Sequence, residues 1–232
     1  MKESICGSMT SKRNLLNETF QRLFRFYGPQ GWWPADNQFE MILGAVLTQN
    51  TTWQNAEKAL SKLRNTGHLT LQSVLELEES DLGSMIRSSG FYNNKTKTLK
   101  ALALYFKNIG GNFKDFKIEE MGDLRLDLLS ITGIGEETAD DIILYAAKLP
   151  SFVIDAYTIR ILERLGITPK SKRYREYKKL MEENLDTDVK LWSEYHALFD
   201  IHAKGICTKN NPRCELCCLF DICEFYKQPL ST

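Results

Sequence analysis

Close to its C-terminal end the chain carries a group of cysteines that restricts its folding more than any other part of the sequence. Five of the six cysteines fall between Cys207 and Cys223, and Cys6 stands apart from them. Four of the five follow the spacing C-x6-C-x2-C-x5-C, as Cys207, Cys214, Cys217 and Cys223. If one centre binds all four sulfurs, the segment between the first and the last must close into a compact loop.

The same spacing limits what that centre can be. Four thiolates in one loop can each bind one iron of a [4Fe–4S] cluster, while nearby backbone amides donate to the sulfurs. Zinc usually prefers two closely spaced cysteine pairs, and only Cys214 and Cys217 form one here. A four-cysteine zinc site and incidental buried thiols are the alternatives, whereas disulfides are not expected in a reducing compartment. We predict the cluster, with Cys218 as a spare thiol that points away from it.

Helical periodicity dominates the rest of the chain. Apolar residues recur with the spacing of amphipathic helices, and no alternating run between turn signals indicates a strand. Most of the prolines lie at breaks between these segments, as expected for many short helices. We therefore predict an all-α fold. An opening amphipathic segment begins at Leu15, and further helices are expected over residues 39–47, 53–63, 70–77, 81–86, 94–109, 123–129, 137–147, 155–165, 174–184 and 189–204.

Composition indicates a globular protein without a membrane span. The 232 residues are 43% hydrophobic, and the longest apolar runs, such as Ile142 to Ala147, are far too short to cross a bilayer. The first residues lack the apolar core of a secretory signal, so we expect a cytoplasmic protein, near the nucleoid in a prokaryote. Thirty basic residues balance thirty acidic ones. A net charge of zero is a mild argument against nucleic acid, which the local clustering of lysines weakens.

A glycine turn and an aspartate form a second pattern. Residues 128–139 read as helix, Gly133-Ile134-Gly135 turn and helix, an arrangement whose free amides suit a phosphate. A plain connector between helices is the alternative. Asp155 follows the apolar stretch 152–154 and enters the next helix. It can cap that helix, and it can also face a sugar carbon that becomes electron-poor as its base departs.

The order of hairpin, helix, aspartate, helix and four-cysteine loop resembles the helix-hairpin-helix DNA glycosylases related to endonuclease III. This resemblance implies two helical lobes, a six-helix lobe over 39–150 that ends in the hairpin, and a lobe from 1–38 and 151–232 that carries the cluster. It also implies a partner, double-stranded DNA with a damaged base that is flipped out of the helix. We expect the protein to act as a monomer, with Asp155 as the catalytic carboxylate.

Two upstream loops extend the resemblance. In Leu47-Thr48-Gln49-Asn50 the position of Gln49 corresponds to a side chain that fills the gap left by a flipped base, with Asn50 beside it. In the second loop Phe91 corresponds to a wedge in the opposite strand. Together with Gly133, Gly135 and Thr138, these residues are the expected DNA contacts. Helix capping is the alternative for Gln49 and Asn50, and core packing is the alternative for Phe91.

One departure from the family concerns strand cleavage. Members that also cut the strand carry a lysine two residues after the second hairpin glycine, and this chain has Glu137 there. A carboxylate cannot form a Schiff base with the sugar, so the resemblance implies release of the base without strand cleavage. Glu137 can alternatively be a first-turn residue favoured by the helix dipole.

The sequence Trp32-Trp33-Pro34 narrows the expected substrate. Indole faces bind cations, and alkylated purines such as 3-methyladenine are cationic and leave readily. With the Gln49 loop and Glu137, this segment resembles the 3-methyladenine DNA glycosylases of the endonuclease III branch, whose base pocket would include Trp32, Trp33, Pro34, Trp53 and Glu137. Core packing is the alternative for the tryptophans. The alternative functions are a uracil, hypoxanthine or mismatch glycosylase of the same fold, and a non-catalytic iron–sulfur DNA-binding protein.

Overall fold

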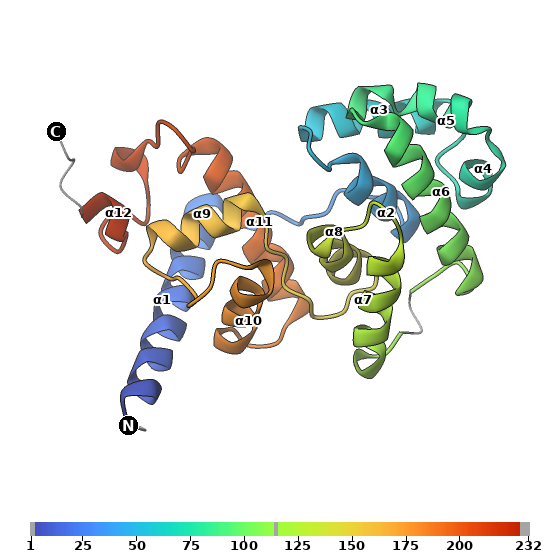
Figure 1. Cartoon of the computed structure of the whole chain (residues 1–232). Coiled ribbons are helices and arrows are strands. Elements are labelled where there is room, and N and C mark those ends of the chain that lie inside the picture. Colours follow the sequence, from blue (N-terminus) through green and yellow to red (C-terminus); the bar gives the residue numbers. More distant parts are fainter. Residues whose placement is uncertain (1–2, 114–115, 228–232) are drawn as a thin grey trace. The chain divides into compact units, whose positions relative to one another are not determined.

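The protein is all-helical, as the sequence predicts (Figure 1). The computed structural model describes residues 3–113 and 116–227, and the side chains of residues 11–113 and 116–227, so the side chain of Cys6 lies outside the described residues. Within these ranges there are no strands. No helix of the described part is long and apolar enough to cross a membrane.

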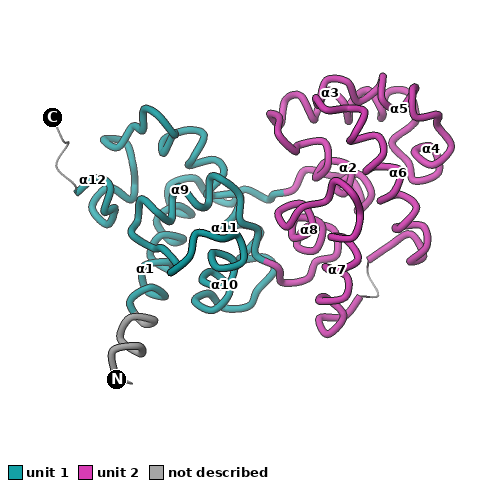
Figure 2. The backbone as a smooth tube through the Cα atoms, in the orientation of Figure 1, with its two compact units in different colours: residues 1–32, 152–232 teal, residues 33–151 magenta. Residues whose placement is uncertain are grey.

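The chain divides into two compact units, drawn in different colours in Figure 2. Unit 1 is made of residues 1–32 and 152–232, and unit 2 of residues 33–151. The sequence placed the boundary at residue 39, whereas residues 33–38 belong to unit 2. The reason is Trp33, whose ring packs on Gly44, Trp53 and Tyr145, all within that unit.

Unit 2 contains seven α-helices in its described residues, the number that the helical periodicity predicts and one more than the six-helix lobe that the resemblance implies. A π-helix, η3 (Ile142–Ala146), continues α8 directly. The α-helices are α2 (Gln38–Leu47), α3 (Trp53–Asn65), α4 (Leu71–Glu76), α5 (Glu79–Met85), α6 (Tyr92–Asn108), α7 (Met121–Ser130) and α8 (Glu136–Asp141).

The centre of unit 2 is α2, in which every residue from Phe39 to Leu47 is buried. The Asn37 side chain starts this helix by accepting from the Glu40 amide at 3.0 Å. The Glu40 carboxylate is itself buried and forms an ion pair with Arg64 of α3, which compensates its desolvation. With α2 surrounded by α3, α6 and η3, the loop that follows Leu47 starts from a rigid base.

Unit 1 joins an N-terminal helix to C-terminal ones. Its helices are α1 (Glu3–Tyr27), α9 (Ala156–Arg164), α10 (Tyr174–Asn184), α11 (Val189–Gly205) and the short α12 (Glu224–Lys227). Leu16 and Leu23 of α1 are fully buried, and the Tyr195 hydroxyl of α11 donates to the Leu16 carbonyl at 2.8 Å. The unit thus depends on contacts between residues almost 180 positions apart in the chain.

Candidate functional site

The predicted hairpin joins α7 to α8 within unit 2. The Arg125 guanidinium of α7 pairs with the fully buried Asp140 of α8, with 2.9 Å between Nε and Oδ1. At the turn, Gly133 has a φ of +92°, and a Cβ there would lie 2.1 Å from the Thr98 hydroxyl oxygen. That hydroxyl donates to the Thr132 carbonyl at 2.9 Å. Both the backbone conformation and the close approach of Thr98 require glycine at position 133.

Gly135 differs from Gly133. Its φ is −96°, a value open to any residue, and no atom lies within 4 Å of a Cβ built on it. The missing side chain therefore leaves open space at the surface where α8 begins. This space lets another molecule come close to the backbone.

Gln49 brings the first predicted loop against the hairpin. Its side-chain amide donates to the Gly133 carbonyl at 3.0 Å and to the Thr138 hydroxyl at 2.8 Å. Three of the predicted DNA contacts therefore lie together. Asn50, the next residue, is exposed and has a left-handed backbone with φ 52°. Such a conformation is uncommon outside glycine, though asparagine tolerates it best.

Phe91 is not a core aromatic. Its side chain is 69% exposed, and its backbone is left-handed, with φ 47°, at the residue that precedes α6. A bulky residue in this conformation is a strained position, and such positions gather at functional sites. The exposed ring fits the wedge role implied by the resemblance, and it excludes the alternative of core packing.

The two adjacent tryptophans fall in different units. Trp33 lies edge-on to Trp53, with ring centroids 5.7 Å apart, and tilted against Tyr145 at 5.5 Å. Trp32 is the last residue of the first segment of unit 1 and is partly buried. Pro34 and Glu137 are exposed. The structure therefore places Trp33 in direct contact with Trp53 within unit 2.

A cavity of about 560 Å³ opens beside Trp33. Tyr145, Gln38 and Lys148 also line it, together with apolar residues of α2 and η3. Burial lowers the pKa of Lys148, whose backbone is left-handed with φ 57°. Neither Trp53 nor Glu137 lines this cavity. The sequence did not single out Tyr145 or Lys148, because both follow an apolar run that reads as plain helix.

Asp155 is the N-cap of α9 in unit 1. One carboxylate oxygen accepts from the Thr158 amide at 2.6 Å, and the other lies 3.8 Å from Nε2 of His196. The cap predicted for this residue is therefore present. Its carboxylate is partly buried, with an exposed fraction of 16%. A carboxylate held in this way keeps a fixed direction and has one oxygen that is not used by the cap.

His196 is a site residue that sequence reasoning missed. It lies in the middle of α11, with a side chain that is 10% exposed. Its position reads as an ordinary buried helix position, and Asp155 lies some forty residues earlier in the chain. Only the packing of α9 against α11 brings the two side chains together.

The four predicted cysteine ligands are free thiols that gather in one loop of unit 1. The sulfurs of Cys207, Cys214, Cys217 and Cys223 are close enough to act on one another electrostatically. Burial raises the pKa of the Cys217 thiol to about 12. A cation that binds this sulfur as thiolate must therefore offset its desolvation. Among the described residues, no group of three or more His, Cys, Asp or Glu side chains is arranged to hold a metal ion.

Two of these sulfurs accept hydrogen bonds, and the Cys223 thiol donates one to the Arg164 carbonyl at 3.2 Å. The Arg164 guanidinium donates to the Cys207 sulfur at 3.1 Å, and the Leu219 amide donates to the Cys217 sulfur at 3.4 Å. Arg164 also donates to the carbonyls of Thr208 and Lys209, so one side chain holds the start of the loop. Donors of this kind stabilise thiolates that bind iron.

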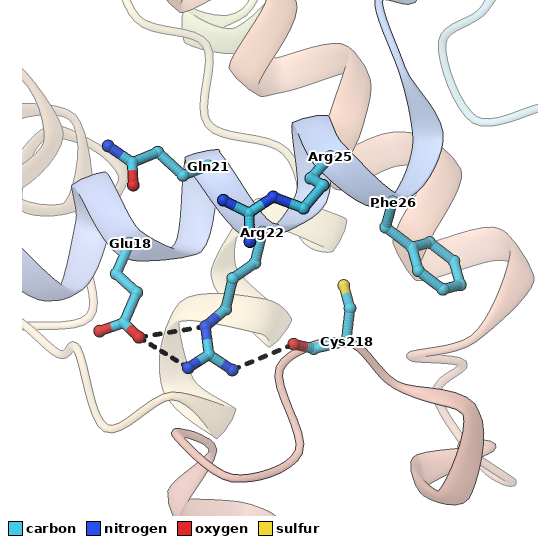
Figure 3. A pocket seen from close by; sticks show the side chains of 6 residues that line it. All are labelled: Glu18, Gln21, Arg22, Arg25, Phe26 and Cys218. Carbon is cyan, nitrogen blue, oxygen red and sulfur yellow. Dashed lines mark hydrogen bonds and ion pairs between the residues drawn. The ribbon is translucent and has the colours of Figure 1, made fainter.

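Cys218 lies on the side of the loop that faces α1. Its thiol lines a surface pocket with Arg25 and Phe26, and its carbonyl accepts from Arg22 at 3.4 Å (Figure 3). Arg22 is also bound by Glu18, one turn earlier, and by Asp221. These contacts tie the middle of the cysteine loop to the N-terminal helix.

Comparison with known proteins decides the family. Residues 43–187 match the model of the HhH-GPD superfamily base excision DNA repair proteins. This chain belongs to the HhH-GPD superfamily. The match begins in α2 and runs through the Gln49 loop, the hairpin and Asp155, whereas Trp32-Trp33-Pro34 and the cysteine loop lie outside the matched residues. The chain is thus a DNA glycosylase of base excision repair.

Individual relatives agree with this HhH-GPD assignment. A putative DNA repair glycosylase of Methanocaldococcus jannaschii is 39% identical over 92% of this chain and 97% of its own length. The endonuclease III of Sulfolobus acidocaldarius is 30% identical over 82% and 83%. A crystal structure of an H. pylori 3-methyladenine DNA glycosylase bound to 1,N6-ethenoadenine is 30% identical, with a TM-score of 0.65 over 83% of this chain and 97% of that one.

Proposed function

We propose that this HhH-GPD protein is a monofunctional glycosylase that hydrolyses the N-glycosidic bond of alkylated purines, such as 3-methyladenine, in double-stranded DNA. The observation that carries the proposal is the pair of acidic residues at the two family positions. Asp155 is held as a helix cap with one oxygen unused by the cap, and Glu137 occupies the place of the strand-cleaving lysine.

Asp155 would act on the sugar. As the bond between C1′ and the base nitrogen breaks, its electron pair leaves with the base and C1′ becomes positive. A fixed carboxylate stabilises this charge, and it can take the proton of the water that attacks C1′. The Thr158 amide orients the carboxylate, and His196 approaches its second oxygen. The water oxygen ends on C1′, so the product is an abasic site in an uncut strand.

Glu137 supports the lack of strand cleavage. Schiff-base formation needs an amine that attacks C1′ and then loses water, and a carboxylate offers no such amine. Glu137 lies in the first turn of α8, exposed beside the Gly135 opening. At that place the family lysine would be presented to the DNA.

The aromatic residues support an alkylated purine as substrate. Trp33 and Trp53 meet edge to face in unit 2, and an indole face attracts a cationic ring. A positively charged purine also leaves without prior protonation. This suits a site in which Asp155 is the single proposed catalytic carboxylate. The likeness to the H. pylori 3-methyladenine DNA glycosylase favours the same class.

The cysteine loop fits a [4Fe–4S] cluster with Cys207, Cys214, Cys217 and Cys223 as ligands. All four thiols are free and belong to one loop of unit 1. The sulfur-directed donors Arg164 and Leu219 fit this assignment. When bound, the cluster would cross-link the loop and add an electron-transfer centre.

Base release from defined duplexes tests the proposal. Duplexes that carry 3-methyladenine, 7-methylguanine, hypoxanthine or uracil are incubated with the protein and analysed with and without alkali. We expect strand breaks only after alkali, and only in the alkylated duplexes. Asp155→Asn is expected to lower the rate by a factor of about 100 or more while DNA affinity persists, because the charge that opposes the cation is removed.

Other results would change the assignment. Release of uracil or hypoxanthine alone would keep the reaction and replace the substrate. Breaks without alkali would contradict the monofunctional mechanism. Binding of every duplex with release from none would favour a non-catalytic DNA-binding protein, and an unchanged rate in Asp155→Asn would remove the carboxylate from the mechanism.

A further inference from the structure

Lys95 of α6 is a buried lysine whose ammonium group is fully occupied by backbone. The residue is 3% exposed, and its Nζ donates to the carbonyls of Leu47, Gln49 and Ser89 at 2.9, 2.9 and 2.7 Å. An ammonium group has three N–H donors, so each hydrogen has its own acceptor. Among the residues that the structure describes, no carboxylate forms an ion pair with it, and burial lowers its pKa to about 8.

The three acceptors belong to two separate loops. Leu47 and Gln49 bracket the end of α2, and Ser89 lies two residues before Phe91. Each loop continues within two residues of the bonded carbonyls into a residue with left-handed backbone, Asn50 in one loop and Phe91 in the other. Both residues are exposed. Left-handed backbone is disfavoured at residues other than glycine and persists only where surrounding contacts impose it.

The helix that carries Lys95 also supports the hairpin. One turn later, Thr98 donates to the Thr132 carbonyl and fills the space beside Gly133. Positions three apart lie on the same face of a helix. A single face of α6 therefore contacts the Gln49 loop, the Phe91 loop and the glycine turn. These are the three segments from which unit 2 would contact DNA.

We infer that Lys95 is a positioning residue, which fixes the Gln49 loop and the Phe91 loop relative to each other so that both can insert into damaged DNA together. This inference rests on the proposed function, since it concerns how that site engages a flipped base. A buried ammonium is costly to desolvate, and an apolar side chain would avoid this cost. The three carbonyls explain why lysine stands here, because no other side chain offers three diverging donors on one atom.

The test compares Lys95→Met with Lys97→Met. Methionine has a similar length but no donor, and Lys97 is an exposed lysine on the same helix, so both variants lose one positive charge. Amide hydrogen exchange of the purified protein is measured in residues 48–51 and 89–92. We expect exchange in both segments to accelerate about tenfold or more in Lys95→Met, because bonds to a charged donor are lost, and to stay unchanged in Lys97→Met.

A binding measurement gives the second readout. The affinity for a duplex with a tetrahydrofuran abasic-site analogue is divided by the affinity for the same duplex undamaged. Insertion is needed only for the first, so we expect this ratio to fall about tenfold or more in Lys95→Met. Its affinity for undamaged DNA should fall no further than in Lys97→Met. Lys95→Gln, which keeps two donors, replaces Lys95→Met if circular dichroism shows the latter to be unfolded.

The outcomes separate the inference from the proposed function. Unchanged exchange in either segment, or an unchanged ratio, would overturn the role of Lys95, because the two loops would then hold their places without it. A wild-type protein that releases no base from any duplex would refute the proposed function. In that case exchange and the binding ratio still decide on Lys95, since neither depends on base release.

Discussion

At the scale of single residues, two carboxylates define the proposed chemistry by what they allow and what they prevent. Asp155 caps α9 through the Thr158 amide, which leaves its second oxygen directed at His196. Glu137 lies exposed at the start of α8, where it offers no amine that could attack the sugar. We expect replacement of either side chain to change the proposed reaction.

The Glu137 position therefore offers a gain-of-function test. We expect Glu137→Lys to form a Schiff base with the C1′ of an abasic site, which borohydride would reduce to a stable amine that links protein and DNA. The covalent complex is measured as a shifted band on a denaturing gel. Glu136→Lys adds the same charge one residue earlier and should form no such complex. A complex with the unmodified protein would show that another amine, such as Lys148, already reaches the sugar.

Some site residues could be predicted because their roles depend on the conformation of the backbone next to them. The Gly133 turn and the Asp155 cap both follow from a few neighbouring residues. Lys95 and His196 could not be predicted as site residues, because their partners are carbonyls and a carboxylate that only tertiary packing brings near. Phe91 combines both situations. Its position in a loop could be predicted from the sequence, but the exposure of its side chain could not.

At the scale of secondary-structure elements, the two glycines of the hairpin have different structural roles. Gly133 is held in positive φ against Thr98, whereas Gly135 has an ordinary backbone and open space around it. The first glycine serves the fold, and the second leaves room for a ligand. The sequence predicted both as part of one motif and could not tell them apart.

This difference predicts opposite effects for the same substitution. Gly133→Ala is expected to lower the free energy of unfolding by about 2 kcal/mol or more, because alanine must adopt a disfavoured φ and push Thr98 aside. Gly135→Ala should leave stability within about 0.5 kcal/mol and weaken DNA binding instead. Chemical denaturation and duplex affinity measure the two effects. Equal destabilisation by both substitutions would contradict the assignment of roles.

Most helices could be predicted to within two or three residues, since their apolar period and capping residues are local signals. Tyr174–Asn184 matches α10 at both ends. The π-helix that continues α8 and the short turns near Ser89 and Cys214 were not predicted. Such short or irregular pieces are set by the packing around them and carry no periodic signal of their own.

At the scale of the whole molecule, the proposed cluster loop and the proposed DNA-contacting loops belong to different units. The four cysteines and Asp155 lie in unit 1, while Gln49, Phe91 and the hairpin lie in unit 2. The sequence predicts a boundary at residue 39, whereas residues 33–38 belong to unit 2, because no local signal shows that Trp33 packs on Gly44.

Removal of iron should therefore act on one unit. We expect oxidative loss of the cluster, or Cys217→Ser, to accelerate amide exchange over residues 205–227, since the cross-link among four sulfurs disappears. Exchange in α2 and α6 should remain as in the intact protein. Iron and sulfide content and visible absorbance report the loss. Faster exchange throughout unit 2 would contradict this independence, and a colourless protein with one zinc per chain would refute the cluster.

The divided construction of unit 1 has a consequence for synthesis. During synthesis α1 emerges from the ribosome first, and all of unit 2 follows. The α11 residues that cover Leu16 and Leu23 emerge only afterwards. Unit 2 can fold once Ser151 has emerged, whereas α1 must wait with its apolar stripe exposed. In a nascent chain the loops and hairpin proposed to hold DNA would therefore fold before the surroundings of Asp155, so the proposed DNA-binding segments form before the proposed base-releasing carboxylate is in place.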